Sequence, residues 1–140
     1  MPLGVRMIGA GVAAVAALAV VSTVPAQVRA DDGAGPSALT LTVGDGTSLD
    51  AVTNQRTVLL ICSPTALGTH PQASQACDEL SAAGGDFGRL RGAPMRFCQN
   101  LYQPVIVAAD GVWNGAPVSY RRTFANSCME KNGSKYVFAF

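Results

Sequence analysis

The hydrophobic pattern over residues 37–63 is that of two β-strands. Residues 37–43 (SALTLTV) alternate apolar and polar side chains, as a strand with one buried face does, and the Gly-Asp-Gly at residues 44–46 ends the pattern. Residues 57–62 (TVLLIC) are mainly β-branched or apolar, which predicts a second and more deeply buried strand. The proline and glycine within residues 63–68 predict a loop after it.

A helical pattern follows this loop. Pro71 suits the first turn of a helix, and Gly84 with Gly85 would end one. Between them, apolar residues recur at helical spacing: Ala73, Ala76, Cys77, Leu80 and Ala83. The predicted helix over residues 71–83 therefore presents Cys77 on its buried stripe, facing a strand that ends at Cys62. A bridge between these two cysteines would need that arrangement. Residues 86–91 allow one further short turn.

The last third of the chain is rich in strand signals. Residues 105–113 form a long strand-like run, and Asn114-Gly115 is a strong hairpin turn signal. Residues 118–124 return with alternating character, and residues 136–140 predict a last strand. One helix and about five strands favour an α+β domain, in which a helix packs on an antiparallel sheet.

The first residues have the pattern of a secretory signal peptide. Arg6 supplies a positive start, and residues 7–21 are all apolar or glycine. This run is shorter than the ~20 residues of a membrane span. Small-residue cleavage sites follow at Ala26 and Ala30, so we expect a signal peptide over residues 1–26, with cleavage after residue 30 as the alternative. A retained membrane anchor is the competing interpretation.

Removal of the leader would give an exported chain with no membrane segment. Its residues 27–36 are small, polar or charged and predict a flexible N-terminal arm before a domain over residues 37–140. The net charge of the whole chain is +1, and it has no run of Lys or Arg, which disfavours nucleic acid as a partner.

The cysteines predict disulfides and not a metal site. All four cysteines follow the leader, and an even number in a small exported chain predicts two disulfides. Four cysteines allow three pairings, and their spacing alone does not choose among them. With His70 as the one histidine and no Cys-x-x-Cys, zinc is disfavoured, and no metal or cofactor is expected. His70 lies between Thr69 and Pro71, which favours the end of a loop over a catalytic role.

The segment from Phe97 to Pro104 carries the most specific functional signal. It is a short segment attached to the domain at Cys98 and ended by Pro104. A loop that is already held extended binds in a protease cleft without much of the ordering cost that a free peptide meets. The alternative interpretation is an ordinary exposed connection between a helix and a strand.

Several motifs, in the right order over residues 37–140, resemble the Streptomyces subtilisin inhibitor family. They are Gly68-Thr69-His70-Pro71, Cys77, Asp110-Gly111-Val112-Trp113, Val118-Ser119-Tyr120, Cys128 and Val137-Phe138-Ala139-Phe140. The resemblance implies a five-stranded antiparallel sheet with two helices on one face and neighbour-paired disulfides, Cys62–Cys77 and Cys98–Cys128. It also implies a secreted homodimer that inhibits subtilisin-type serine proteases and is not an enzyme.

The resemblance also implies a reactive bond. The family's Cys-Pro-Met-Val-Tyr-Asp-Pro pattern corresponds to residues 98–104, so Asn100 would precede the bond (position P1) and Leu101 would follow it (position P1′). The remaining loop residues would contact the protease: Phe97, Cys98, Gln99, Tyr102 and Gln103.

Two residues depart from that pattern. Gln99 replaces a proline that would fix φ, and Asn100 replaces an apolar or basic residue. We therefore expect weaker inhibition of subtilisin or a different target protease, and a trypsin-like target is disfavoured because P1 is neither Lys nor Arg.

Two other functions compete with inhibition of a serine protease. A thermolysin-like metalloprotease is one possible target, because such clefts favour a large apolar residue at P1′, where Leu101 stands. A secreted binding or structural protein that has lost inhibition is the other, favoured by Gln99 and Asn100. A small enzyme ranks third because the sequence contains no recognisable catalytic constellation.

Overall fold

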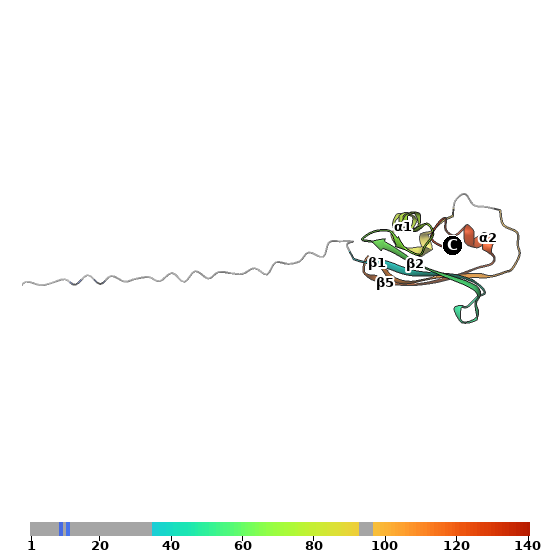
Figure 1. Ribbon diagram of the computed structural model, residues 1–140, viewed down its shortest axis with the longest axis horizontal. Coiled ribbons are helices and arrows are strands. Elements are labelled where there is room, and N and C mark those ends of the chain that lie inside the picture. The colour runs from blue at the N-terminus through green and yellow to red at the C-terminus, as the bar shows by residue number, and fades with distance from the viewer. Residues whose placement is uncertain (1–8, 10, 12–34, 93–96) are drawn as a thin grey trace, which may run out of the picture.

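Five antiparallel strands form one sheet in the order β3-β2-β1-β4-β5, and both helices lie on one face of it (Figure 1). The computed structural model describes residues 9, 11, 35–92 and 97–140. Apart from residues 9 and 11, the predicted leader lies outside the described residues, and so do residues 27–34 of the predicted arm. The strands are β1 (Ser37–Asp45), β2 (Thr53–Ser63), β3 (Leu67–Gly68), β4 (Val105–Trp113) and β5 (Ala116–Phe124). The helices are α1 (Ala73–Ala82) and α2 (Ser127–Lys131), with 3-10 turns at Leu49–Ala51 and Phe87–Arg89.

The core lies between the sheet and the helices. Strand β1 is central, paired with β2 on one side and with β4 on the other, and its alternation directs every second residue into the core. The core residues of the sheet are Leu39, Leu41, Val43, Leu60, Val105, Val107 and Ala109. Helix α1 covers them with Ala76, Cys77 and Leu80. The predicted α+β class is therefore confirmed, and so is the predicted helix, which begins two residues later than expected.

The turns of the chain follow the predicted chemistry. Asn114 and Gly115 have φ of 48° and 78°, the left-handed pair that a tight hairpin turn requires, and they join β4 to β5. The backbone N–H of Asn114 also donates to Ser37 Oγ at 2.8 Å, which attaches the turn to the start of β1. Gly84 and Gly85 end α1 with φ of 67° and 76°.

The predicted strand over residues 136–140 is wrong. Val137 and Phe138 are buried in the core, but the backbone of this segment bonds to side chains and not to a neighbouring strand. The carboxylate of Glu79 accepts the N–H groups of Lys135, Tyr136 and Val137 at 2.8, 2.9 and 3.2 Å. The fifth strand is instead β3, which lies in the segment predicted as a loop and pairs with β2 at Leu60 and Ile61.

His70 is a structural residue. It is buried, and its Nδ1 accepts the N–H of Gln72 at 2.9 Å, so the ring proton lies on Nε2 and is donated to the carbonyl of Val137 at 3.0 Å. The ring therefore connects the start of α1 with the C-terminal segment, in agreement with the non-catalytic interpretation of the sequence.

Both disulfides have the neighbour pairing that the family resemblance implies. Cys62 and Cys77 join β2 to α1 with a Cα–Cα distance of 5.4 Å, and Cys98 and Cys128 are 5.7 Å apart. The second bridge attaches the segment before β4 to α2, a helix that the resemblance implied and the hydrophobic pattern did not.

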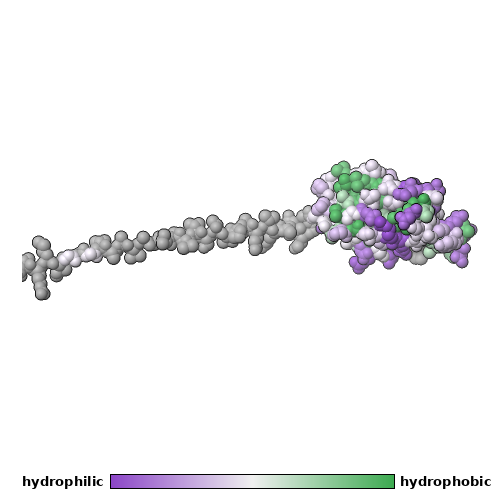
Figure 2. All heavy atoms as spheres, turned by 90° about the horizontal axis from the view of Figure 1, so that it is seen from below, coloured by the Kyte–Doolittle hydropathy of each residue, from purple (hydrophilic) through white to green (hydrophobic). Residues whose placement is uncertain are grey.

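The face of the sheet opposite the helices carries many polar groups. Figure 2, which views the molecule from below Figure 1, shows hydrophilic surface with smaller hydrophobic areas beside it. On this face Arg121 and Asp110 form an ion pair at 2.9 Å, and the hydroxyl groups of Thr42 and Thr57 lie 3.3 Å apart. Within the residues that the structure describes, no helix has the length and apolar character that a membrane crossing requires.

Candidate functional site

Residues 97–104 form an exposed loop that leads into β4, in the position predicted from the sequence. Its largest apolar side chains are open to solvent: Phe97 is 99%, Tyr102 71% and Leu101 52% exposed. Gln99, Asn100 and Gln103 are exposed as well. Burial of apolar surface lowers the free energy by roughly 25 cal/mol per Å². A partner that covered these exposed side chains would therefore gain affinity from them.

The side chain of Asn126 holds the centre of the loop. Its Nδ2 group donates to the carbonyl oxygens of Gln99 at 3.2 Å and Leu101 at 2.9 Å. These are the carbonyls on either side of Asn100, and two carbonyls that are two residues apart point the same way only where the chain is extended. The backbone around Asn100 is therefore extended and fixed from behind.

Asn126 is itself immobilised. It is only 8% exposed, and its Oδ1 accepts the N–H of Met129 at 2.9 Å, so it is the N-cap of α2. Because Oδ1 serves the helix, both hydrogens of Nδ2 remain for the loop, and the orientation of the amide follows from these partners. Any motion of the loop centre must break bonds to a group that is anchored in the helix.

Further contacts join the loop to the same segment of chain, residues 125–132, which we call the α2 platform. The N–H of Gln103 donates to the carbonyl of Ala125 at 2.8 Å, and the N–H of Gly92 donates to the carbonyl of Asn132 at 2.8 Å. The Cys98–Cys128 disulfide lies between these two contacts. The loop is therefore attached to one platform before, at and after its centre.

The side chain of Asn100 lies on the outer side of the loop. A hollow of about 270 Å³ lies behind the loop, and Gln99 and Leu101 are among the residues that line it, whereas Asn100 is not. Since side chains alternate along an extended segment, Asn100 points away from the hollow and from the platform. The arrangement can offer one peptide bond, Asn100–Leu101, to a partner while both halves of the loop stay attached.

The pattern in the sequence did not identify Asn126. One signal was available, because an asparagine directly before a short helix is a preferred N-cap. Its contact with the loop could not be found in the same way, because the loop precedes it by 25 residues or more. In the described part of the chain, no group of three or more His, Cys, Asp or Glu side chains is placed to hold a metal ion.

Comparison with known proteins gives consistent matches. A family model described as subtilisin inhibitor-like matches residues 35–126. The chain is 50% identical over 118 residues to subtilisin inhibitor-like protein 2 of Streptomyces rochei, which covers 84% of this chain and 100% of that protein. It is 47% identical over 125 residues to trypsin inhibitor STI2 of Streptomyces longisporus, which covers 89% of this chain and 83% of that protein.

The fold is also similar to a solved structure. Streptomyces caespitosus sermetstatin, in a crystal structure of its complex with Bacillus licheniformis subtilisin, superposes with a TM-score of 0.68 at 43% identity. The similarity covers 76% of this chain and 100% of that chain.

Proposed function

The chain belongs to the subtilisin inhibitor-like family, and from this premise we propose that it inhibits a subtilisin-type serine protease as a tethered substrate mimic. The reactive bond in this proposal joins Asn100 to Leu101. One observation carries it: the two hydrogen bonds from Asn126 fix the carbonyls of Gln99 and Leu101, which bracket that bond. A loop held in this way needs little further ordering when it enters a protease cleft.

The tether explains why such a loop inhibits and is not simply digested. The serine oxygen of the protease attacks the carbonyl carbon of Asn100, the bond to the nitrogen of Leu101 breaks, and the serine proton passes through the enzyme's base to that nitrogen. The new amine then stays beside the acyl-enzyme, because the Asn126 contact holds Leu101 and the Cys98–Cys128 bridge holds the other half. Attack by this amine restores the peptide bond faster than water hydrolyses the ester, since a held reactant has a very high effective concentration.

The exposed side chains of the loop supply binding energy and selectivity. Main-chain pairing with the cleft gives affinity, and pockets for alternate side chains give specificity. Phe97, Leu101 and Tyr102 can each lose apolar surface to the protease. Interfaces of this kind bury about 1,600 Å² and include very tight complexes.

Replacing Asn100 by methionine is expected to tighten binding to a broad-specificity subtilisin at least about tenfold, because an apolar P1 pocket gains roughly that much from a fitting apolar side chain. The measurement is the inhibition constant of each variant. Gln75→Met, on an exposed position of α1, is the matched control and should leave the constant unchanged. Equal constants for the native chain and Asn100→Met would mean that Asn100 does not occupy the P1 pocket.

One experiment tests mechanism and site together. The purified domain is incubated with subtilisin, the residual protease activity is followed, and any cleavage is mapped by mass. Blocked activity with a single slow cleavage between Asn100 and Leu101 supports the proposal. Rapid cleavage at this bond without inhibition, or inhibition with cleavage elsewhere, contradicts it.

A second target class has its own support. Leu101 is 52% exposed, and thermolysin-like metalloproteases favour a large apolar residue on the P1′ side. Assay of the same preparation against subtilisin and thermolysin separates the two targets. A chain that inhibits neither, nor any other member of a broad panel, would be a non-inhibitory binding protein on this fold.

Two further properties belong to this proposal. Export from the cell is supported by the cysteines, because none of them is free and disulfides persist in oxidising compartments. A homodimer is consistent with the exposed face of the sheet opposite the helices, and light scattering of the purified domain tests it (Figure 2).

A further inference from the structure

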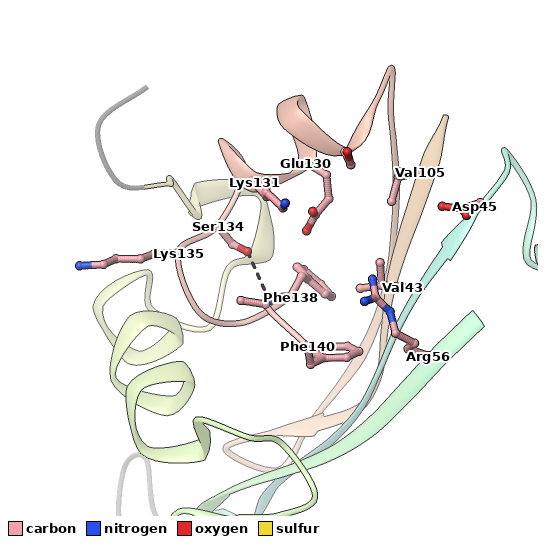
Figure 3. A pocket seen from close by; sticks show the side chains of 12 residues that line it. Val43, Asp45, Arg56, Val105, Glu130, Lys131, Ser134, Lys135, Phe138 and Phe140 are labelled. Carbon is pink, nitrogen blue, oxygen red and sulfur yellow. Dashed lines mark hydrogen bonds between the residues drawn. The ribbon is translucent and has the colours of Figure 1, made fainter. Parts of the chain in front are cut away.

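A second hollow lies on the inner side of the α2 platform, away from the reactive loop. It measures about 460 Å³ and is enclosed by β1, β2, β4, α2 and the C-terminal segment (Figure 3). Glu130 projects into it from α2, toward Phe138 and the sheet, and is only 8% exposed. A carboxyl group in such a place is unusual, because acidic side chains are rarely buried without a partner.

The charged groups around the hollow do not neutralise Glu130 through a direct ion pair. Arg56 reaches the hollow from β2, and Lys131 follows Glu130 on α2. Lys135 in the C-terminal segment points outward in Figure 3. Asp45 on β1 also lines the hollow and accepts the amide of Asn54 at 2.8 Å. Over residues 35–92 and 97–140, the one ion pair joins Arg121 to Asp110 and does not involve Glu130.

Burial therefore dominates the ionisation of this group. It raises the pKa of Glu130 from the ordinary value of 4.5 to about 7, against the smaller opposing effects of Lys131 and Arg56. The carboxyl group is thus neutral in mildly acid solution and ionised in mildly alkaline solution.

Glu130 also lies at the centre of the segment that holds the loop. Its backbone N–H donates to the carbonyl of Asn126 at 3.1 Å, and Cys128 is two residues before it. Asn126 holds the carbonyls of Gln99 and Leu101, so a shift of α2 away from the sheet reaches the loop directly.

We propose that Glu130 is a positioning residue for the reactive loop: its neutral carboxyl group keeps α2 seated on the sheet, and its ionisation loosens α2 and the loop together. This inference rests on the proposed inhibitory function and adds a regulation by pH. The ionised group draws water into the hollow or Arg56 toward itself, which opposes the present position of α2 across the hollow from Val43, Val105 and Phe138. The inhibitor should therefore resist cleavage best in mildly acid solution.

The direction of the effect follows from proton linkage. Between pH 4.5 and about 7 the folded chain keeps the Glu130 proton while the unfolded chain has lost it, so the stability from this group falls across that window and is constant above it. The same holds for any opening of α2 that exposes Glu130 to water.

The test compares hydrolysis of the Asn100–Leu101 bond by saturating subtilisin in the native chain and in Glu130→Gln, at pH 5.5 and pH 8.5. Glutamine has the same shape and no charge, and the ratio of the two rates at each pH cancels the protease's own pH profile. We expect the ratio of the native rate to the variant rate to be about tenfold larger at pH 8.5 than at pH 5.5, below the roughly 30-fold that the full pKa shift allows between these two pH values. Asp78→Asn, an exposed acid on α1, is the control and should follow the native profile.

A rate ratio that is the same at both pH values would overturn the proposal, since a glutamate with a merely structural role changes both rates alike. A second measurement needs neither a variant nor a protease. Amide hydrogen exchange of Gln103, whose N–H is bound to Ala125, is measured from pH 5.5 to 8.5 and corrected for its intrinsic pH dependence. Its protection should fall as pH rises, and constant protection contradicts the role of Glu130. If protection falls while the bond is never cut and no protease is inhibited, the inhibitory function fails and the coupling through α2 stands.

Discussion

Removal of the Cys98–Cys128 bridge is expected to accelerate hydrolysis of the Asn100–Leu101 bond by up to about 300-fold. In the chain-entropy description, a bridge across a separation of 30 residues restricts the chain by roughly 3.5 kcal/mol, and each 1.4 kcal/mol corresponds to about tenfold. The bridge attaches the residues just before the reactive bond to α2. Without it, the acyl half of a cleaved loop moves away from the Leu101 amine, and religation no longer competes with hydrolysis. The measurement is the rate of bond cleavage in the paired variant Cys98→Ser/Cys128→Ser at saturating subtilisin.

The chain contains a matched control for this experiment. The bridge Cys62–Cys77 spans 15 residues and contributes roughly 3 kcal/mol in the same description, but it joins β2 to α1 and does not contact the loop. The variant Cys62→Ser/Cys77→Ser should lose similar stability and keep its slow cleavage, as long as the assay temperature leaves both variants folded. Equal acceleration in the two variants would show that global stability, and not the local tether, protects the bond.

Replacement of Asn126 by alanine is expected to weaken inhibition about 30-fold. The change removes two hydrogen bonds to the loop, each worth about 1 kcal/mol, and every 1.4 kcal/mol corresponds to about tenfold in affinity. It also removes the N-cap of α2, which should lower the free energy of unfolding by about 1 kcal/mol. The inhibition constant and a denaturant titration measure these two losses separately.

Asn126→Asp distinguishes the two roles of this side chain. A carboxylate still accepts the N–H of Met129 and caps the helix, but it cannot donate to the carbonyls of Gln99 and Leu101. We expect this variant to unfold near the native denaturant concentration and to inhibit as poorly as Asn126→Ala. Native inhibition by Asn126→Asp would contradict the role assigned to the two loop contacts.

The parts of the fold that the sequence predicted are those in which local pattern and final packing agree. Residues 105–113 are a run of strand-forming residues followed by Asn114-Gly115, and β4 begins and ends where the pattern does. Cys77 fell on the buried stripe of a helix beside a strand ending at Cys62, and these two cysteines are bridged. In each case neighbouring residues determine the structure.

The wrong or missing predictions concern segments whose structure depends on contacts with residues far away in the sequence. Residues 136–140 are apolar enough for a strand, but Glu79 and His70, more than 50 residues earlier, bind their backbone instead. Strand β3 is only two residues long, too short for a periodic pattern to identify. Nothing in the local sequence shows that the side chain of Glu130 points from α2 toward the sheet, because its burial depends on residues from four other segments of the chain.

The prediction of the proposed reactive loop, residues 97–104, came from two sources. The positions of Cys98 and Pro104 in the sequence predicted an attached segment at Phe97–Pro104, whereas the placement of Asn100 before the reactive bond came from resemblance to a family. The two Asn126 contacts, on which the proposal of this bond rests, are predicted by no spacing rule.

Hydrogen bonds to main-chain atoms hold the centre and the exit of the loop, through the carbonyls of Gln99, Leu101 and Pro104 and the N–H of Gln103. Those atoms are present whatever side chains stand at residues 99–101. Selection can therefore exchange the side chains that face a protease while the stability of the domain stays nearly constant. A library randomised at these three positions should consist mostly of folded proteins, so that new targets can be found by varying the loop alone.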